Sequence, residues 1–315
     1  MSSYNSKKGA YNLTGIPGVS DVYQVTTTST SAGPYNFWNK WFKPRSNMYM
    51  TLAEAEAALT GGINEVVLLS PESHSLSTTL TWDKNMSHLV GEYPSSRMNH
   101  RSRIGMSTAF SPMITVSGYG NLFKNIYTMH GTAAADYIGW SISGVRNTFE
   151  NVHFGGPMAA LQGGHASYEG IAIDGSENYF KNCVIGTDTI GRDETSPNVT
   201  LGAGTLTIFE NCLFLANLTD GDPVFVSVEN SSGYTWALFK SCQFMAFNSN
   251  YATAMTYAFK FSSGSSCAMV LDPGCTFQNV THLAASANHT YIWQPTVFAA
   301  TADELNQLAI HSATY

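Results

Sequence analysis

Short runs of alternating apolar and polar residues recur along the chain, separated by turn residues such as Gly, Asn and Ser. The clearest read YIGWSIS from Tyr137, YEGIAID from Tyr168, NVTLGAG from Asn198, PVFVSVE from Pro223 and TYAFKFS from Thr256. A period of two with many β-branched and aromatic residues is typical of β-strands. Because no ten-residue helical pattern separates these runs, the sequence predicts an all-β protein.

A six-residue motif that begins with Phe also recurs. Its copies are FKNIYT at Phe123, FENVHF at Phe149, FKNCVI at Phe180, FENCLF at Phe209, FKSCQF at Phe239 and FQNVTH at Phe277. They are separated by 26, 31, 29, 30 and 38 residues, and a period of this size indicates stacked structural repeats. These spacings are too short for four-stranded propeller blades, and leucine-rich repeats need a helical segment. We therefore predict a right-handed parallel β-helix whose rungs stack ~4.8 Å apart.

The positions of the motif have separate roles in such a stack. Phe is expected to fill the interior, the charged second residue to face water, and Asn to occupy a bend where its amide bonds the Asn of the next rung. The cysteines are expected to pack as core filler, without a redox or metal role. The predicted ladders are Asn125, Asn151, Asn182 and Asn211, which Ser241 interrupts, and Cys183, Cys212 and Cys242.

Helices are predicted at both ends of the solenoid, where open sheet edges need a cover. TLAEAEAALTGG places Thr51 and Glu54 at capping-box spacing and predicts a helix over 51–60. TADELNQLAIH repeats this spacing with Thr301 and Glu304. Its apolar stripe consists of Leu305, Leu308 and Ala309.

We predict an extended arm over 1–47, the β-helix with its capping helix over 48–285, and a C-terminal cap over 286–315. The arm contains FWNKWFKPR, in which four aromatic residues within six positions cannot all point inward. They either pack on the side of the solenoid or anchor on a partner, because aromatic residues and Arg are enriched at interfaces. The predicted docking residues are Phe37, Trp38, Lys40, Trp41, Phe42, Lys43 and Arg45.

Charge is sparse and unevenly distributed. Only 12% of the residues are charged, and the net charge is −7. Residues 1–50 carry five basic residues and one acid, whereas 200–315 carry two basic residues and seven acids, which indicates different partners at the two ends. No stretch is basic enough for nucleic acid, and the absence of a signal segment or a long apolar run predicts folding in a cytoplasm, away from membranes. Five cysteines without metal-ligand spacing predict reduced thiols and no cofactor.

Acidic residues in two loops are the first candidates for catalysis, because glycoside hydrolysis needs two or three carboxylates on one face. They are Asp188, Asp193, Glu194, Asp220 and Asp222, accompanied only by Arg192. His165 and Glu169 have the spacing of a metal pair, but the flanking glycines predict a loop. A basic cluster without aromatic neighbours comprises Arg97, His100, Arg101 and Arg103. We predict a solvated surface at each of these places and no catalytic, metal or cofactor site.

The segment TLAEAEAALTGGINEVVLLSPESHSLSTTLTWDKNMSHLVGE and the repeated Phe motif resemble the pectin-lyase-like β-helix proteins of bacteriophage virions, over roughly Met48 to Val280. The resemblance implies a helix, a buried strand and a first rung in that order. Members of this group serve as capsid decoration proteins, head fibres, tail fibres or tailspikes, commonly as homotrimers. The resemblance therefore implies a homotrimer that is made in the host cytoplasm and located in the virion.

Two functional hypotheses follow. We favour a non-enzymatic virion protein that decorates or cements a capsid and docks its N-terminal arm on the major capsid protein or another virion protein. The alternative is a tail fibre or tailspike that binds or cleaves host surface polysaccharide, with Tyr168, Tyr234 or Trp236 stacking on sugars. The resemblance implies an acidic cleft in tailspike enzymes, and this sequence departs from that pattern.

Overall fold

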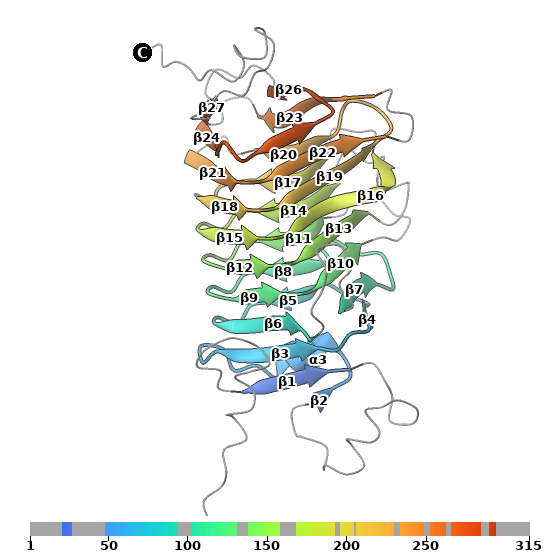
Figure 1. The fold of residues 1–315 in the computed structure, drawn as a ribbon. Helices are drawn as coiled ribbons and strands as arrows, with labels where there is room; N and C mark the ends of the chain where they lie inside the picture. Colours follow the sequence, from blue (N-terminus) through green and yellow to red (C-terminus); the bar gives the residue numbers. More distant parts are fainter. Residues whose placement is uncertain are drawn as a thin grey trace, which may run out of the picture.

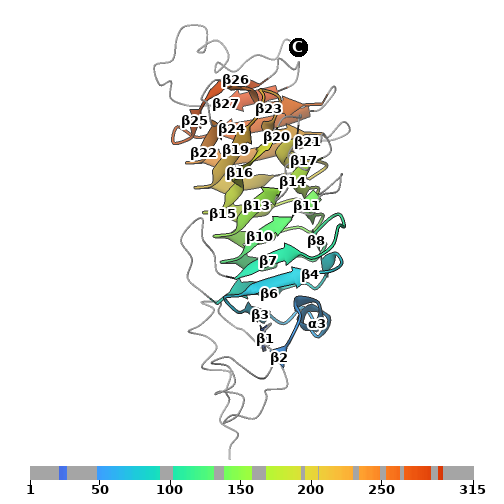
Figure 2. The same ribbon diagram turned by 90° about the vertical axis from the view of Figure 1, so that its right-hand side faces the viewer.

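The chain forms a right-handed parallel β-helix, which confirms the predicted fold class (Figure 1). This computed structural model describes residues 21–26, 48–92, 102–130, 138–157, 168–192, 196–204, 206–229, 234–248, 253–262, 266–284 and 290–293. Three parallel sheets, here named A, B and C, run along the stack, and each rung passes from A to B to C. Figure 2 shows the same stack from the side. No helix among the described residues is long and apolar enough to cross a bilayer.

Sheet A has eleven strands and sheets B and C have eight each. In spatial order, sheet A contains β2 (Met48–Tyr49), β1 (Val22–Val25), β3 (Glu65–Leu69), β6 (Ser87–Gly91), β9 (Leu122–Lys124), β12 (Thr148–Glu150), β15 (Asn178–Lys181), β18 (Thr207–Glu210), β21 (Tyr234–Lys240), β24 (Ser266–Leu271) and β27 (Thr290–Trp293). Sheet B contains β4 (Ser73–Leu76), β7 (Arg103–Met106), β10 (Tyr127–His130), β13 (His153–Pro157), β16 (Val184–Arg192), β19 (Leu213–Leu218), β22 (Gln243–Phe247) and β25 (Thr276–Gln278). Sheet C contains β5 (Leu80–Trp82), β8 (Ile114–Val116), β11 (Ile138–Ile142), β14 (Glu169–Ile173), β17 (Pro197–Leu201), β20 (Val224–Val228), β23 (Met255–Phe261) and β26 (Val280–Ala284).

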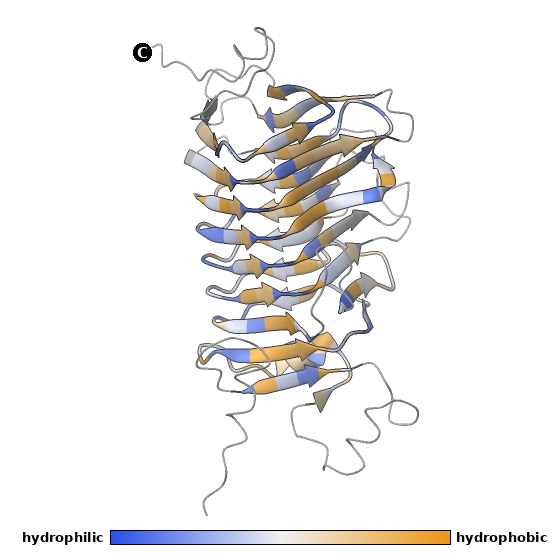
Figure 3. Cartoon of the chain, viewed as in Figure 1, coloured by the Kyte–Doolittle hydropathy of each residue, from blue (hydrophilic) through white to orange (hydrophobic). Residues whose placement is uncertain are grey.

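The interior of the stack is organised around a column of phenylalanines from sheet A. Figure 3 shows the alternation of apolar and polar residues along the strands that directs one set of side chains inward. Adjacent rings in the column are stacked with centroids 4.6 to 5.0 Å apart, which matches the spacing between neighbouring strands. The column consists of Phe123, Phe149, Phe180, Phe209 and Phe239, all fully buried and in register.

The sixth motif copy does not belong to this column. Phe277 lies in sheet B and stacks on Phe244 with centroids 4.6 Å apart, whereas the residue opposite Phe239 is Leu271. The turn that follows Leu271 is longer than its equivalents, and Asp272 Oδ1 accepts the backbone amides of Ser241 and Gly274 there. The motif at Phe277 therefore resembles the other copies only in sequence, because this Phe lies in sheet B and the others lie in sheet A.

Asparagines occupy the corner between sheets A and B in the left-handed conformation, with φ between 53° and 57° at Asn125, Asn151, Asn182 and Asn211. Nδ2 of Asn151 donates to Oδ1 of Asn125 over 2.8 Å, and Nδ2 of Asn211 donates to Oδ1 of Asn182 over 2.7 Å. Ser241 continues the corner with φ 50°. These side chains link consecutive rungs at the sharpest bend.

Free, buried cysteines follow this corner on the inner side. The thiols of Cys183, Cys212 and Cys242 donate to the carbonyl of the Phe one rung earlier, over 3.3 to 3.5 Å. Cys275 does the same with Phe239 over 3.3 Å and is a fourth member that the motif search missed. Burial and the neighbouring Cys183 thiol raise the pKa of Cys212, so the Cys212 thiol stays protonated.

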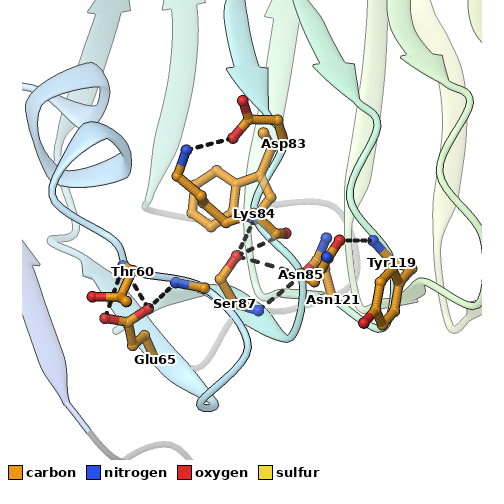
Figure 4. A network of polar contacts seen from close by, with 10 residues as sticks. Thr60, Glu65, Asp83, Lys84, Asn85, Ser87, Tyr119 and Asn121 are labelled. Atoms are coloured by element: carbon orange, nitrogen blue, oxygen red, sulfur yellow. Dashed lines mark hydrogen bonds and ion pairs between the residues drawn. The ribbon is translucent and has the colours of Figure 1, made fainter.

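A second asparagine ladder, absent from the sequence-based predictions, lies buried at the corner between sheets C and A. Each side-chain oxygen accepts the amide of the residue one rung earlier: Ser87 to Asn121 over 2.9 Å, Asn121 to Asn147 over 2.9 Å and Asn147 to Asn178 over 3.0 Å. Figure 4 shows its first step, from Ser87 to Asn121. The available signal was an Asn two residues before the Phe of three motif copies.

A short helix covers the N-terminal end of the stack (Figures 1 and 2). α3 (Leu52–Ala57) begins with the predicted capping box between Thr51 and Glu54 and buries Leu52 and Ala55, but it ends before the predicted limit at residue 60. Beyond the helix, the amides of Thr60 and Gly61 donate to the fully buried Glu65, and Figure 4 shows Thr60 beside this carboxylate. Glu65 thus ties the segment after the helix to β3.

The predicted boundary of the N-terminal arm at residue 47 is wrong for β1, which pairs in parallel with β3 from Val22↔Val66 to Val25↔Leu69. Tyr23 anchors the strand, because its hydroxyl donates to Glu65 Oε1 over 2.9 Å. The stretch VYQV is too short to stand out from its polar neighbours. Residues 21–26 therefore belong to the solenoid.

We expect Glu65→Gln to lower the free energy of unfolding by about 2 kcal/mol. In the parent, several groups donate hydrogen bonds to the two carboxylate oxygens. Glutamine replaces one of these oxygens with an NH₂ group, which cannot accept a hydrogen bond, so a buried donor loses its partner. Chemical denaturation monitored by circular dichroism measures this. Glu150→Gln is the control, since it removes only the partly exposed ion pair with Lys124 and should change stability by less than about 1 kcal/mol. Equal effects of the two variants would contradict the role of Glu65.

Candidate functional site

Small side chains line the outer face of sheet C, which leaves room for a ligand there. Trp140 and Ile171 point into the core from its strands, so the alternate residues face outward. The outward residues form one in-register row across β8, β11, β14, β17 and β20. They are Thr115, Ser141, Ala172, Thr200 and Ser227.

A groove of about 440 Å³ lies over this row. Its lining consists of Ile138, Ser141, Glu169, Ala172, Ile173, Asp174, Thr200, Gly202, Ala203 and Glu229. Glu169 begins β14, whereas Asp174 and Glu229 directly follow β14 and β20. Three carboxylates from two rungs therefore line one hollow.

The backbone is adapted to bring these carboxylates in. Asp174, Gly202 and Glu229 occupy equivalent positions on successive rungs, because Ile173, Leu201 and Val228 are paired in register. A Cβ at Gly202 would lie 2.0 Å from Asp174 Oδ1, so a larger residue there would displace that carboxylate from its present position. Ser227 Oγ donates to Glu229 Oε1 over 3.3 Å and helps to orient the second acid.

Among the acids that line the groove, Glu169 has the clearest shift in pKa. Burial and then the charge of Glu229 raise its pKa to about 6, and Asp174 adds to the rise. Thr200 lies beside this carboxylate and lowers its pKa, which partly offsets the rise. The Thr200 hydroxyl makes no hydrogen bond of normal geometry. A carboxyl group with this pKa can hold and release a proton near neutral pH.

A buried stack supports the backbone that leads into Glu169. The Tyr168 ring is stacked on His130, with centroids 5.2 Å apart, and Arg192 Cζ lies 5.3 Å from its centroid. Arg192 donates to Ser196 and Asn198, and burial lowers its pKa to about 10. Tyr168 is only 2% exposed, so the hypothesis that it stacks on sugars is wrong. Its role is to hold the start of β14.

The acids predicted from the sequence lie elsewhere. Asp188 is exposed on β16 in sheet B, and Asp220 Oδ1 accepts the Asp222 amide over 3.0 Å in the loop before β20. None of these three lines the groove. Glu169 is the first residue of a strand, which corrects its prediction as a loop residue. No three metal-ligating side chains converge within the described part of the chain.

The other predicted site residues lie outside the described residues or away from the groove. Outside are all the docking residues, Phe37, Trp38, Lys40, Trp41, Phe42, Lys43 and Arg45, together with Arg97, His100, Arg101, His165, Asp193 and Glu194, and the C-terminal helix residues Thr301 to Ala309. Arg103 in β7 lies over the Tyr127 ring at 5.9 Å. Tyr234 and Trp236 belong to β21 in sheet A, so they do not border the groove on sheet C.

The raised pKa of Glu169 predicts that this residue destabilises the fold at neutral pH. Its pKa rises from 4.5 to about 6 on folding, so the folded state binds the proton more tightly and loses stability as the pH rises through that window. Glu169→Gln should therefore be more stable than the parent by about 1 kcal/mol at pH 7.5, after allowance for solvent screening. The difference should vanish at pH 4. Thermal unfolding at the two pH values measures it, and a constant difference would contradict the shift.

Comparison with known proteins identifies the fold but no sequence family, because no family model and no curated sequence matches the chain. Pectin methylesterase from Aspergillus niger superposes with a TM-score of 0.52 at 13% identity, covering 95% of this chain and 92% of the other. Pectin methylesterase PemA from Erwinia chrysanthemi gives 0.51 at 13% identity, covering 90% and 91%. Pectate lyase Pel9A gives 0.51 at 14% identity, covering 90% and 82%.

These similarities correct the prediction that the chain is not an enzyme. Solved structures that share the fold over most of both chains are pectin methylesterases and a pectate lyase, so the solenoid is a scaffold on which enzymes are built. A bacteriophage CAB120 tailspike matches with a TM-score of only 0.34, which is too low to argue a virion origin. The chain thus has the pectin-lyase-like β-helix fold, with an acidic groove on sheet C.

Proposed function

We propose that the protein binds a polysaccharide along the outer face of sheet C and hydrolyses a glycosidic bond there. The observation that supports this most strongly is that Glu169, Asp174 and Glu229 all line one groove of about 440 Å³. A floor of small residues lets an extended chain lie across several rungs. Pectin methylesterase, which shares the fold, has been solved in complex with a hexasaccharide, and this adds support.

The three carboxylates suit hydrolysis because that reaction needs one protonated and one ionised acid. Glu169 is the proton donor in this proposal, since its pKa of about 6 keeps part of the population protonated near neutral pH. Glu229, whose Oε1 accepts a hydrogen bond from Ser227, is the second carboxylate in this proposal. It either activates water or attacks the sugar directly, while Glu169 protonates the departing oxygen.

The test is release of new reducing ends from a panel of uncharged, amino-bearing and acidic polysaccharides by the purified full chain. Activity on at least one polymer supports the proposal when Glu169→Gln removes it and Asp188→Asn does not. Asp188→Asn is a suitable control, because it neutralises an exposed acid on sheet B. Retained activity in Glu169→Gln would sink the assignment.

The virion setting, the docking arm and the homotrimer remain predictions from the sequence. If the chain is a tailspike, as in the alternative hypothesis, the groove would be the site at which it hydrolyses a glycan. Alanine at Trp38 and Trp41 tests docking without removing β1, which any deletion through residue 26 would destroy. Unchanged incorporation of this variant into particles would rule out anchoring by the two tryptophans.

A further inference from the structure

The charge of the groove restricts the substrates that it can take. Its lining contains three acids, and none of its residues is basic. Lys260 is the basic residue nearest along the outward row; it is in register with Ser227, on the strand next to the one that Glu229 follows, and it does not line the groove. Three carboxylates in the lining thus face a single lysine outside it.

The floor supplies a second feature that points to a polar ligand. Thr200 is 6% exposed and lines the groove, and its hydroxyl lies beside the Glu169 carboxylate without a hydrogen bond of normal geometry. Buried polar atoms in folded proteins are normally paired, so an unpaired one at the bottom of a hollow is a place for a ligand's donor or acceptor. A sugar hydroxyl or amino group fits this requirement.

On the basis of the proposed function, we infer that the groove takes a glycan carrying free amino groups, such as a glucosamine polymer. Ammonium groups would balance Asp174 and Glu229 at short range, whereas uronate or sulfate groups would be repelled. A calcium ion could bridge acids to an acidic glycan, but no three ligands converge for one among the described residues. The substrate thus differs in charge from pectin.

Isothermal titration of the full chain with matched hexasaccharides tests this inference. The probes are a glucosamine hexamer, its N-acetylated counterpart and a galacturonate hexamer, each with EDTA and with calcium. The glucosamine hexamer should bind about tenfold more tightly than the N-acetylated one, and added salt should reduce the difference. The galacturonate hexamer should show no binding in either condition.

Charge-removing variants identify the groove as the source of this preference. Asp174→Asn and Glu229→Gln should each weaken the glucosamine hexamer about fivefold while leaving the N-acetylated hexamer nearly unchanged. Asp188→Asn makes the same charge change on sheet B and should alter neither. Tighter binding of the N-acetylated or galacturonate hexamer would overturn the inference and leave a glycan site standing. Failure of all three hexamers to bind would instead overturn the proposed function.

Discussion

Glutamine at position 169 is expected to lower the turnover number for glycan hydrolysis by about 100-fold to 10,000-fold, the usual contribution of a positioned acid. The amide keeps the shape of the side chain but has no proton to give to the departing sugar. Initial rates of reducing-end release at saturating substrate measure the change. The variant should unfold no more easily than the parent, because Glu169 is half-buried next to Glu229 and is destabilising when charged.

The pH profile separates a proton donor from a residue that only shapes the groove. Activity of the parent should decline as the pH rises above about 6, since Glu169 loses its proton there. Residual activity of the glutamine variant should lack this decline. An unchanged profile in the variant would show that another group donates the proton.

Alanine at position 180 is expected to destabilise the solenoid by about 3 to 5 kcal/mol, the usual effect of removing a buried phenyl ring. Phe180 is stacked between Phe149 and Phe209, with centroids 4.6 and 4.8 Å away, and is fully buried. Because rungs on both sides would face the resulting cavity, neighbouring strands cannot collapse into it without losing register. Denaturant unfolding monitored by tryptophan fluorescence measures the loss.

Tyr119→Ala is the matched control for this experiment. Its ring is 48% exposed at the corner between sheets C and A, so its loss should change stability by no more than about 0.5 kcal/mol. A loss below about 1 kcal/mol in Phe180→Ala would mean that the column is not a main source of stability.

The repeat could be predicted from the sequence because stacking imposes the same requirement at each rung. Phe149, Phe180 and Phe209 recur near a 30-residue period since each must cover the ring below. Phe277 fits the motif in sequence but lies in sheet B, because the turn before it is longer than in the other rungs. The spacing between motif copies could not show this difference. β1 was missed because a strand of four residues leaves almost no periodic signal.

The groove was hidden from the sequence for a different reason. Glu169 and Glu229 are 60 residues apart and meet only because two turns of the solenoid separate them. A usable signal was present in the runs YEGIAID and PVFVSVE, where Asp174 and Glu229 follow the last apolar residue. Aligning the sheet C strands with one another, in addition to the Phe motifs, would have placed these two acids at equivalent positions two rungs apart.

Connections between the sheets differ sharply in length. Five successive turns from sheet A to sheet B, from β9–β10 to β21–β22, each contain two residues, whereas the crossings from sheet B to sheet C between β10 and β23 contain four to eleven. Insertions and deletions can therefore accumulate at the second crossing without shifting the phenylalanine column, whereas these five turns keep a single length. Since the variable crossing leads directly to the strands that bear Glu169 and Thr200, evolution can remodel the rim of the groove while the scaffold is inherited unchanged.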